Sequence, residues 1–324
     1  MKSAEPLMSE QQASPHPRVS SVRLGRPDYV SVIVRLTSME LYKIRRRAMS
    51  KVLSLLGILA TIGLFALFAL IVLLMSRSGA SADAINNFSE ALRLPGSLTW
   101  TGQLLSTLGQ VLIIILVSTI VGGEYTAGTV RLMLTRGPTR TQIFFSKVGV
   151  ALVCIVLGVV GITLLGIISG FLFNLTTSIT ATFDFFSMAW LGHAVLYLLA
   201  IMLGLFVYAM MALCLSTLGR ATAAGLAGVL TWSFLIEPLI ETISYFGRGI
   251  SGPVGSFFQS LPDYLIGTNI GVLVGNQEQY LISANAGLQA GGPSNLQALL
   301  VLVVYIVVFV GSAWWVTIRR DVTN

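Results

Sequence analysis

An uncharged stretch of 24 residues, Val52–Met75, constrains the fold of this chain more than any other feature of its sequence. As an α-helix it would be about 36 Å long at ~1.5 Å per residue, enough to cross the ~30 Å hydrocarbon core of a bilayer. The basic segment Lys43–Lys51 precedes it, and Lys and Arg gather on the cytoplasmic side of membrane helices. We therefore expect an integral membrane protein whose first span leaves the cytoplasm near residue 52.

Five further apolar runs follow, and with the first they predict an all-α membrane protein with six transmembrane helices. The fifth run is the weakest, since Glu237 and Pro238 interrupt it. The composition agrees, because 10% of the residues are charged, against roughly 25% in soluble domains. The expected spans are residues 52–75, 103–121, 148–173, 190–215, 221–243 and 297–318.

The basic residues also predict the orientation of the chain. All but three of the 20 Lys and Arg residues fall on the side expected to be cytoplasmic, and the exceptions are Arg77, Arg93 and Arg248. Six spans with this bias place both termini in the cytoplasm, in a multi-pass protein of the plasma (inner) membrane. The net charge of +7 does not indicate a nucleic-acid partner, because the charges sit at span ends rather than along one soluble face.

The segment before the first span divides into two parts. Residues 1–28 are rich in Ser, Pro and Gln and are expected to be a disordered cytoplasmic tail, which leaves 29–324 as one six-span domain. Tyr29–Lys51 is expected to be helical, either as an interfacial helix or as an extension of the first span. Its apolar side would be formed by Tyr29, Val32, Leu36 and Met39.

A long outer loop, Ser244–Leu296, is expected before the last span. It mixes Gly, Pro and aromatic residues. Because irregular backbone is not tolerated in lipid, the segment should lie at the outer interface or re-enter against protein. A solvent-exposed loop is the alternative.

Few groups within the spans could carry chemistry. Glu237 is the most costly of them, and it could line a substrate path or be packed beside Pro238 near the interface. The two cysteines, Cys154 and Cys214, lie in apolar runs and predict neither a disulfide nor a metal site. His193 is expected to be a satisfied interfacial histidine.

The connection between the second and third spans is the segment that suggests a mechanism. Glu124 stands at the end of the second span, and Thr129–Thr135 is long enough for about two helical turns before Gly137 and Pro138 stop the helix. The turns carry both apolar and basic residues, so they could dock in a cleft of a soluble partner. An ordinary positively charged cytoplasmic loop explains the same residues equally well.

This connection resembles that of the permease subunits of ABC-2 type ABC transporters. In that family the corresponding spans are joined by E-x-x-x-G-T, a leucine-rich turn, and P-x-x-R before a span led by Lys. The matching positions are Glu124, Gly128, Thr129, Leu132, Leu134, Pro138, Arg140 and Lys147. The segments Glu40–Arg47 and Trp314–Asp321 also look like the family's first and last segments. The Ser/Pro-rich tail and the large outer loop depart from its pattern.

The resemblance implies a short cytoplasmic coupling helix that contacts a nucleotide-binding subunit, with Arg131 and Arg136 among the contacting residues. The sequence contains no G-x-x-x-x-G-K-[ST] motif, so ATP and Mg²⁺ are expected on a separate ABC ATPase, and this chain is expected to be non-catalytic and to bind no cofactor. A second permease copy or a related permease is also implied. Export is expected, and the cargo stays open.

Two other functions compete with an ABC permease. A secondary transporter or channel driven by an ion gradient would need buried charged pairs and broken helices near the membrane midplane, and only Glu237–Pro238 suggests them. A membrane enzyme is disfavoured, because the spans carry no Ser-His-Asp or H-E-x-x-H pattern.

Overall fold

The computed structural model describes residues 29–128, 139–177, 186–247, 249, 252–282 and 293–319. Within these residues every regular element is a helix and none is a strand. The elements are α1 (Tyr29–Arg46), α2 (Ala48–Arg77), α3 (Ala82–Glu90), α4 (Gly96–Leu104), η1 (Leu105–Gly109), α5 (Gln110–Thr126), α7 (Arg140–Thr177), α8 (Met188–Gly219), α9 (Thr222–Thr231), η2 (Trp232–Ile236), α10 (Glu237–Gly247), α11 (Pro253–Ser260), η3 (Pro262–Tyr264), α12 (Ile266–Ile282) and α13 (Asn295–Arg319).

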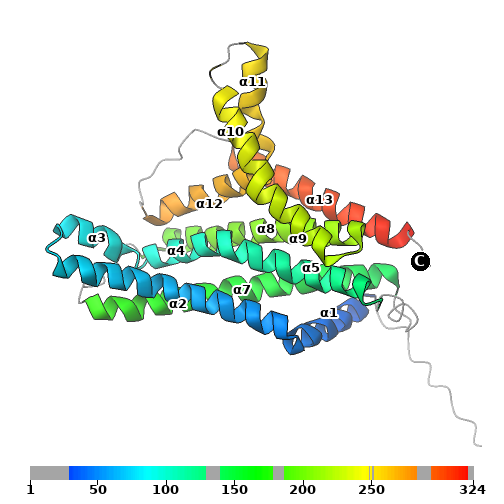
Figure 1. The fold of residues 1–324 in the computed structure, drawn as a ribbon, viewed down its shortest axis with the longest axis horizontal. Helices are drawn as coiled ribbons and strands as arrows, with labels where there is room; N and C mark the ends of the chain where they lie inside the picture. Colours follow the sequence, from blue (N-terminus) through cyan, green and yellow to red (C-terminus); the bar gives the residue numbers. More distant parts are fainter. Residues whose placement is uncertain are drawn as a thin grey trace, which may run out of the picture.

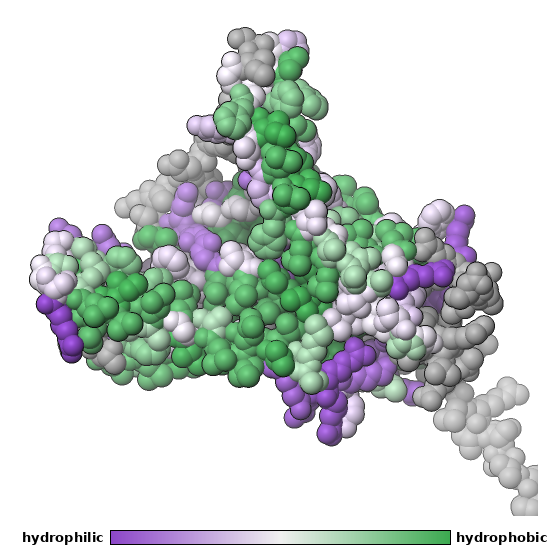
Figure 2. Space-filling view, viewed as in Figure 1, coloured by the Kyte–Doolittle hydropathy of each residue, from purple (hydrophilic) through white to green (hydrophobic). Residues whose placement is uncertain are grey.

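The six predicted spans are confirmed as helices. In the part of the chain that the structure describes, six helical stretches are long and apolar enough to cross a membrane. They are α2, the continuous α4–η1–α5, α7, α8, the continuous α9–η2–α10, and α13. Figure 2 shows hydrophobic surface along the middle of the bundle and hydrophilic groups toward its two ends. The chain is therefore a multi-pass membrane protein.

The long helices lie roughly side by side along the longest axis of the molecule (Figure 1). One end of the bundle carries α1, the end of α5, the start of α7 and the end of α13, and we call it the α1 end. The opposite end carries α3, the start of α4 and the start of α8, and we call it the α3 end. α10 and α11 form a hairpin that projects sideways from the bundle.

Helix α8 forms the centre of the core, where it packs against α5, α9, α12 and α13. Its fully buried side chains include Tyr197, Ile201 and Met210. Elsewhere small residues let helices approach closely, as membrane bundles require. Gly166 of α7 lies so close to α4 that a Cβ there would overlap the Thr101 hydroxyl, and a Cβ on Gly170 would lie 2.8 Å from that of Ser97.

The N-terminal helix is separate from the first span. α1 ends at Arg46, and the extended backbone of Arg47 (φ −74°, ψ 132°) separates it from α2, so it does not extend the first span. On the predicted apolar side, Tyr29 and Met39 are about half exposed, and its contact with lipid stays a prediction. The face that packs on α7 instead carries Thr37 and Ile44, because Gly149 of α7 leaves room for the Thr37 side chain.

The segment expected as a long loop before the last span is mostly helical. It contains the end of α10 and all of α11, η3 and α12, and residues 283–292 lie outside the described part. α12 packs along α8 in the opposite direction. Near its start Gly267 faces Tyr208, and near its end the Leu281 carbonyl accepts a hydrogen bond from Trp190 Nε1 (3.3 Å). The α12 part of the segment therefore packs against protein rather than forming a solvent loop, and its depth in the membrane stays a prediction.

Candidate functional site

The predicted coupling segment has two well-defined ends in the structure. α5 ends at Thr126, and Gly128 follows with a positive φ of 64°, the left-handed conformation that glycine adopts at helix ends. α7 begins with a capping box: Gln142 N–H donates to Thr139 Oγ1 (3.3 Å), and Thr139 N–H donates to Gln142 Oε1 (3.0 Å). The predicted residues Thr129, Arg131, Leu132, Leu134, Arg136 and Pro138 lie outside the described residues.

A buried ion pair joins the second span to the third. Lys147 Nζ of α7 donates to Glu124 Oε2 of α5, and their side chains are 11% and 4% exposed. Arg140 Nη1, in the first turn of α7, donates to the Ile318 carbonyl in the last turn of α13 (3.0 Å). Four residues of the predicted coupling site are described: Glu124, Gly128, Arg140 and Lys147. All of them except Gly128 make contacts that connect the second, third and last spans at the α1 end.

Glu237, the acid predicted within the fifth span, lies at the start of α12. It is 4% exposed. Its carboxylate accepts hydrogen bonds from the backbone N–H groups of Ile266 (3.1 Å) and Gly267 (3.1 Å), from Tyr208 Oη (3.1 Å) and from Trp232 Nε1 (2.8 Å). The first N–H groups of a helix have no partner within it and attract anions, so the carboxylate caps α12. A role in a substrate path stays a prediction.

A π-helical turn brings Trp232 and Glu237 together. In a π-helix residue i is hydrogen-bonded to residue i+5, and the backbone N–H of Glu237 donates to the Trp232 carbonyl. Two side chains five residues apart in an α-helix would point in different directions. The same turn precedes Pro238, which has no N–H to donate. The broken geometry of the fifth span therefore places its one buried acid against α12.

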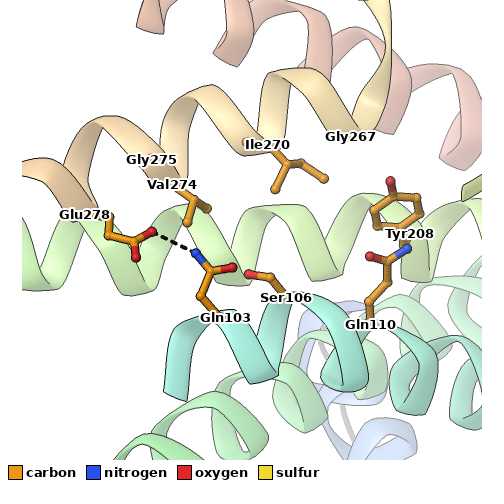
Figure 3. Close-up of a pocket in the computed structure, with 10 residues that line it drawn as sticks. Gln103, Ser106, Gln110, Tyr208, Gly267, Ile270, Val274, Gly275 and Glu278 are labelled. Carbon is orange, nitrogen blue, oxygen red and sulfur yellow. Dashed lines mark hydrogen bonds between the residues drawn. The ribbon is translucent and has the colours of Figure 1, made fainter. Parts of the chain in front are cut away.

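A cavity of about 220 Å³ lies between the second span and α12 (Figure 3). Gln103, Ser106 and Gln110 line it from α4, η1 and α5. α12 contributes Gly267, Ile270, Gly271, Val274, Gly275 and Glu278, and α8 contributes Tyr208. Gln103 Nε2 donates to Glu278 Oε2 (2.9 Å) at one end, and Gln110 and Tyr208 face each other at the other end.

Sequence reasoning missed these cavity residues. The three polar residues of the second span recur at intervals of three and four, which places them on one helical face. That signal was available in the sequence, but Glu278 was expected in a loop. Among the described residues there is no group of three or more His, Cys, Asp or Glu side chains that could hold a metal ion.

The comparisons with known proteins give a family but no activity. No curated protein matches the sequence. Residues 66–323, from within the first span to the end of the last, match the family described as "Protein of unknown function (DUF2705)". This match covers well over half of the chain, and the chain therefore belongs to the DUF2705 family.

Proposed function

We propose that this chain is the membrane-spanning permease subunit of an ATP-driven ABC transporter of the ABC-2 type, and that it works as an exporter. In this proposal the α1 end of the bundle faces the cytoplasm, and residues 129–138 form the coupling helix that docks on a separate ABC ATPase. ATP and Mg²⁺ bind to that ATPase. A second copy of this chain or a related permease completes the transporter in the plasma membrane.

The observation that supports the proposal most is the way the connection between α5 and α7 is attached. The Glu124–Lys147 pair holds the helices on both sides of it, and Arg140 links its far end to α13. A push on residues 129–138 would thus reach three spans at once rather than deform one loop. Rigid-body movement of packed helices is one of the ways in which transporters change state.

α1 fits the same arrangement. It lies at the α1 end against α7 and carries basic residues in its last turn, Lys43, Arg45 and Arg46. Long basic side chains at a membrane surface reach the lipid phosphates while their methylene groups stay in apolar surroundings. We propose that α1 lies in the cytoplasmic headgroup region beside the coupling segment.

Co-purification tests the proposal. The tagged chain is extracted from its native membranes in a mild detergent, and its partners are identified by mass spectrometry. The proposal predicts an ATPase with a P-loop motif among them. A variant with residues 129–138 replaced by a Gly/Ser linker should lose the ATPase. The matched control replaces residues 283–292, the same number of residues next to α12, and should keep it.

Two results would count against the proposal. One is an ATPase that binds equally well to the linker variant, which would remove the coupling role of 129–138. The other is transport by the purified chain in vesicles that have an ion gradient but no ATP, which would favour a secondary transporter.

A further inference from the structure

The cavity has a polar wall on the second span, and on α12 a wall in which three glycines stand between Ile270, Val274 and Glu278. Gln103, Ser106 and Gln110 project from the second span toward α12 (Figure 3). On the opposite side, α12 contributes Gly267, Gly271 and Gly275. A Cβ built on Gly271 or Gly275 would meet no atom within 4 Å. Side chains at these two positions would fill the space. The glycines therefore keep the cavity open along about 10 Å of the second span, at ~1.5 Å per residue.

The backbone of the second span is irregular at the same place. η1, Leu105–Gly109, is a π-helical turn that contains Ser106. Such turns are rare and are frequently found at functional sites. Ser106 Oγ is buried and has no hydrogen-bond partner among the described residues. A buried hydroxyl without a partner is costly, and a change of the Ser106 rotamer toward the cavity would let a bound polar molecule satisfy it.

The charge of the cavity selects the kind of ligand. Glu278 is the one charged residue among the ten that line it, and Lys, Arg and His are absent from that set. Among the described residues Glu278 forms no ion pair, and its hydrogen-bond donor is the Gln103 amide. Since a carboxylate offers about four acceptor positions, most of them are open to a donor from a ligand. Phosphates and other anions would be repelled.

We propose that this cavity binds a protonated primary amine, with its three N–H groups donated to the Glu278 carboxylate, the Gln103 carbonyl oxygen and Ser106 Oγ. The side-chain N–H of Gln103 donates to Glu278. The carbonyl oxygen of Gln103 is therefore an acceptor on the same wall as Ser106 (Figure 3). A quaternary ammonium lacks N–H donors and is usually held by several aromatic rings. Here one tyrosine, Tyr208, lines the cavity, and its hydroxyl donates to Glu237.

The size of the cavity limits what it encloses. About 220 Å³ is smaller than the ~300–1,000 Å³ of pockets for drug-sized ligands. It holds an amine head group and a few more heavy atoms. The amine could be a small soluble molecule or the head of an amphiphile whose chain lies in the membrane, and both share the same recognition.

Isothermal titration on the full-length chain in phosphatidylcholine nanodiscs tests the inference, because that lipid has no primary amine. n-Butylammonium in solution and dodecylammonium in the bilayer represent the two sources. Saturable binding of either one supports the site and identifies the source. Tetramethylammonium and inorganic phosphate should not bind. If neither amine binds, or if tetramethylammonium binds as well as butylammonium, the inference is wrong.

Three variants locate the binding. Glu278→Gln removes the charge and should weaken amine binding at least about tenfold, as expected for the loss of a charged hydrogen bond. Ser106→Ala should weaken it by a smaller factor. Gly271→Leu fills the open space and should abolish amine binding. This variant tests the site if Glu278→Gln does not fold. Glu241→Gln is the matched control, an exposed carboxyl outside the cavity that accepts a hydrogen bond from Thr268 of α12.

Unchanged binding in both Glu278→Gln and Gly271→Leu would place the amine elsewhere and overturn the inference. The assay needs no ATPase, so its failure would leave the transporter proposal untouched, and the inference does not rest on that proposal.

Discussion

The carboxylate of Glu237 lies 3.1 Å from the backbone nitrogen of Ile266 and accepts its hydrogen bond, which joins the fifth span to the first turn of α12. The link depends on η2, because the π-helical turn aligns Glu237 with Trp232 and aims it at α12. α12 forms one wall of the cavity, so the position of that wall depends on this carboxylate.

Removal of the Glu237 carboxylate should destabilise the protein. Glu237→Ala leaves the N–H groups of Ile266 and Gly267 and the indole of Trp232 without their acceptor, at a cost of about 1–3 kcal/mol for a buried donor. Thermal unfolding in detergent measures the loss. Glu241→Ala, an exposed change on the same helix, should alter stability by less than about 0.5 kcal/mol. Equal effects of the two variants would show that the cap contributes nothing.

The close contact between α7 and α4 predicts a difference between two glycines of one helix. Gly166→Ala should destabilise by about 1–3 kcal/mol, because the added methyl group overlaps the Thr101 side chain. Gly161→Ala should be tolerated, since a Cβ there meets nothing within 4 Å. Unfolding temperatures of the two variants check this. The packing is misplaced if Gly161→Ala is the more harmful change.

The Glu124–Lys147 pair should behave as a buried ion pair. Lys147→Met removes the ammonium group that neutralises the buried Glu124 carboxylate, and we expect a loss of about 3–5 kcal/mol. The double variant Glu124→Gln with Lys147→Met should recover much of the loss, because no charge is left buried. Unfolding in detergent measures both.

The control for that pair is Lys43→Met in α1. Lys43 also pairs with a carboxylate, Glu40, but its side chain is 41% exposed. The Lys43 ammonium is in contact with water although the Glu40 side chain is 11% exposed, so its removal should cost less than that of Lys147, about 1 kcal/mol. If Lys147→Met were no worse than this control, the two spans would not be held together by their ion pair.

Amine binding in the cavity should depend on pH through Glu278. Burial raises the pKa of its carboxyl above the ordinary value of 4.5, and the hydrogen bond from Gln103 opposes that rise. The ligand needs the ionised carboxylate, so affinity should be constant above the raised pKa and fall as the pH drops through it. Glu278→Gln should show no such fall. Titration calorimetry at a series of pH values measures it.

Other titratable groups that face this part of α12 are Tyr197 and His193 of α8. His193 is bonded through its Nδ1 to Gln277 Oε1 (2.7 Å) and stacked on Tyr280 of α12, so it helps to position that helix. His193→Gln is therefore the control for an effect that does not come from Glu278. A fall in affinity that disappears in His193→Gln and persists in Glu278→Gln would contradict the assignment.

The spans could be predicted from sequence because each is a continuous apolar run, and hydropathy alone reports that. The packed face of α1 could not, since the half-buried Thr37 lies on it because Gly149 of α7 leaves room for its side chain. The capping box of Thr139 and Gln142 could be recognised in the sequence, but it lies in a segment expected to be a loop. α12 has a glycine stripe and polar residues at its end, so its sequence resembles a loop until α8 and Glu237 hold it.

The candidate site was predicted in part for the same reasons. Glu124, Arg140 and Lys147 flank a connection between two apolar runs, so their position at the α1 end follows from the spans. That Glu124 meets Lys147 and Arg140 meets Ile318 depends on how three helices pack. The cavity needs α12 in place, and hydropathy does not place it.

Photo-crosslinking from the connection between α5 and α7 tests the central claim most directly. A benzoylphenylalanine is introduced at Leu132, within residues 129–138, and native membranes are irradiated. The account predicts a crosslinked product that contains a P-loop ATPase, and no such product from a probe at Asp83 of α3, at the opposite end of the bundle. A crosslink to the ATPase from position 83 but not from position 132 would contradict it.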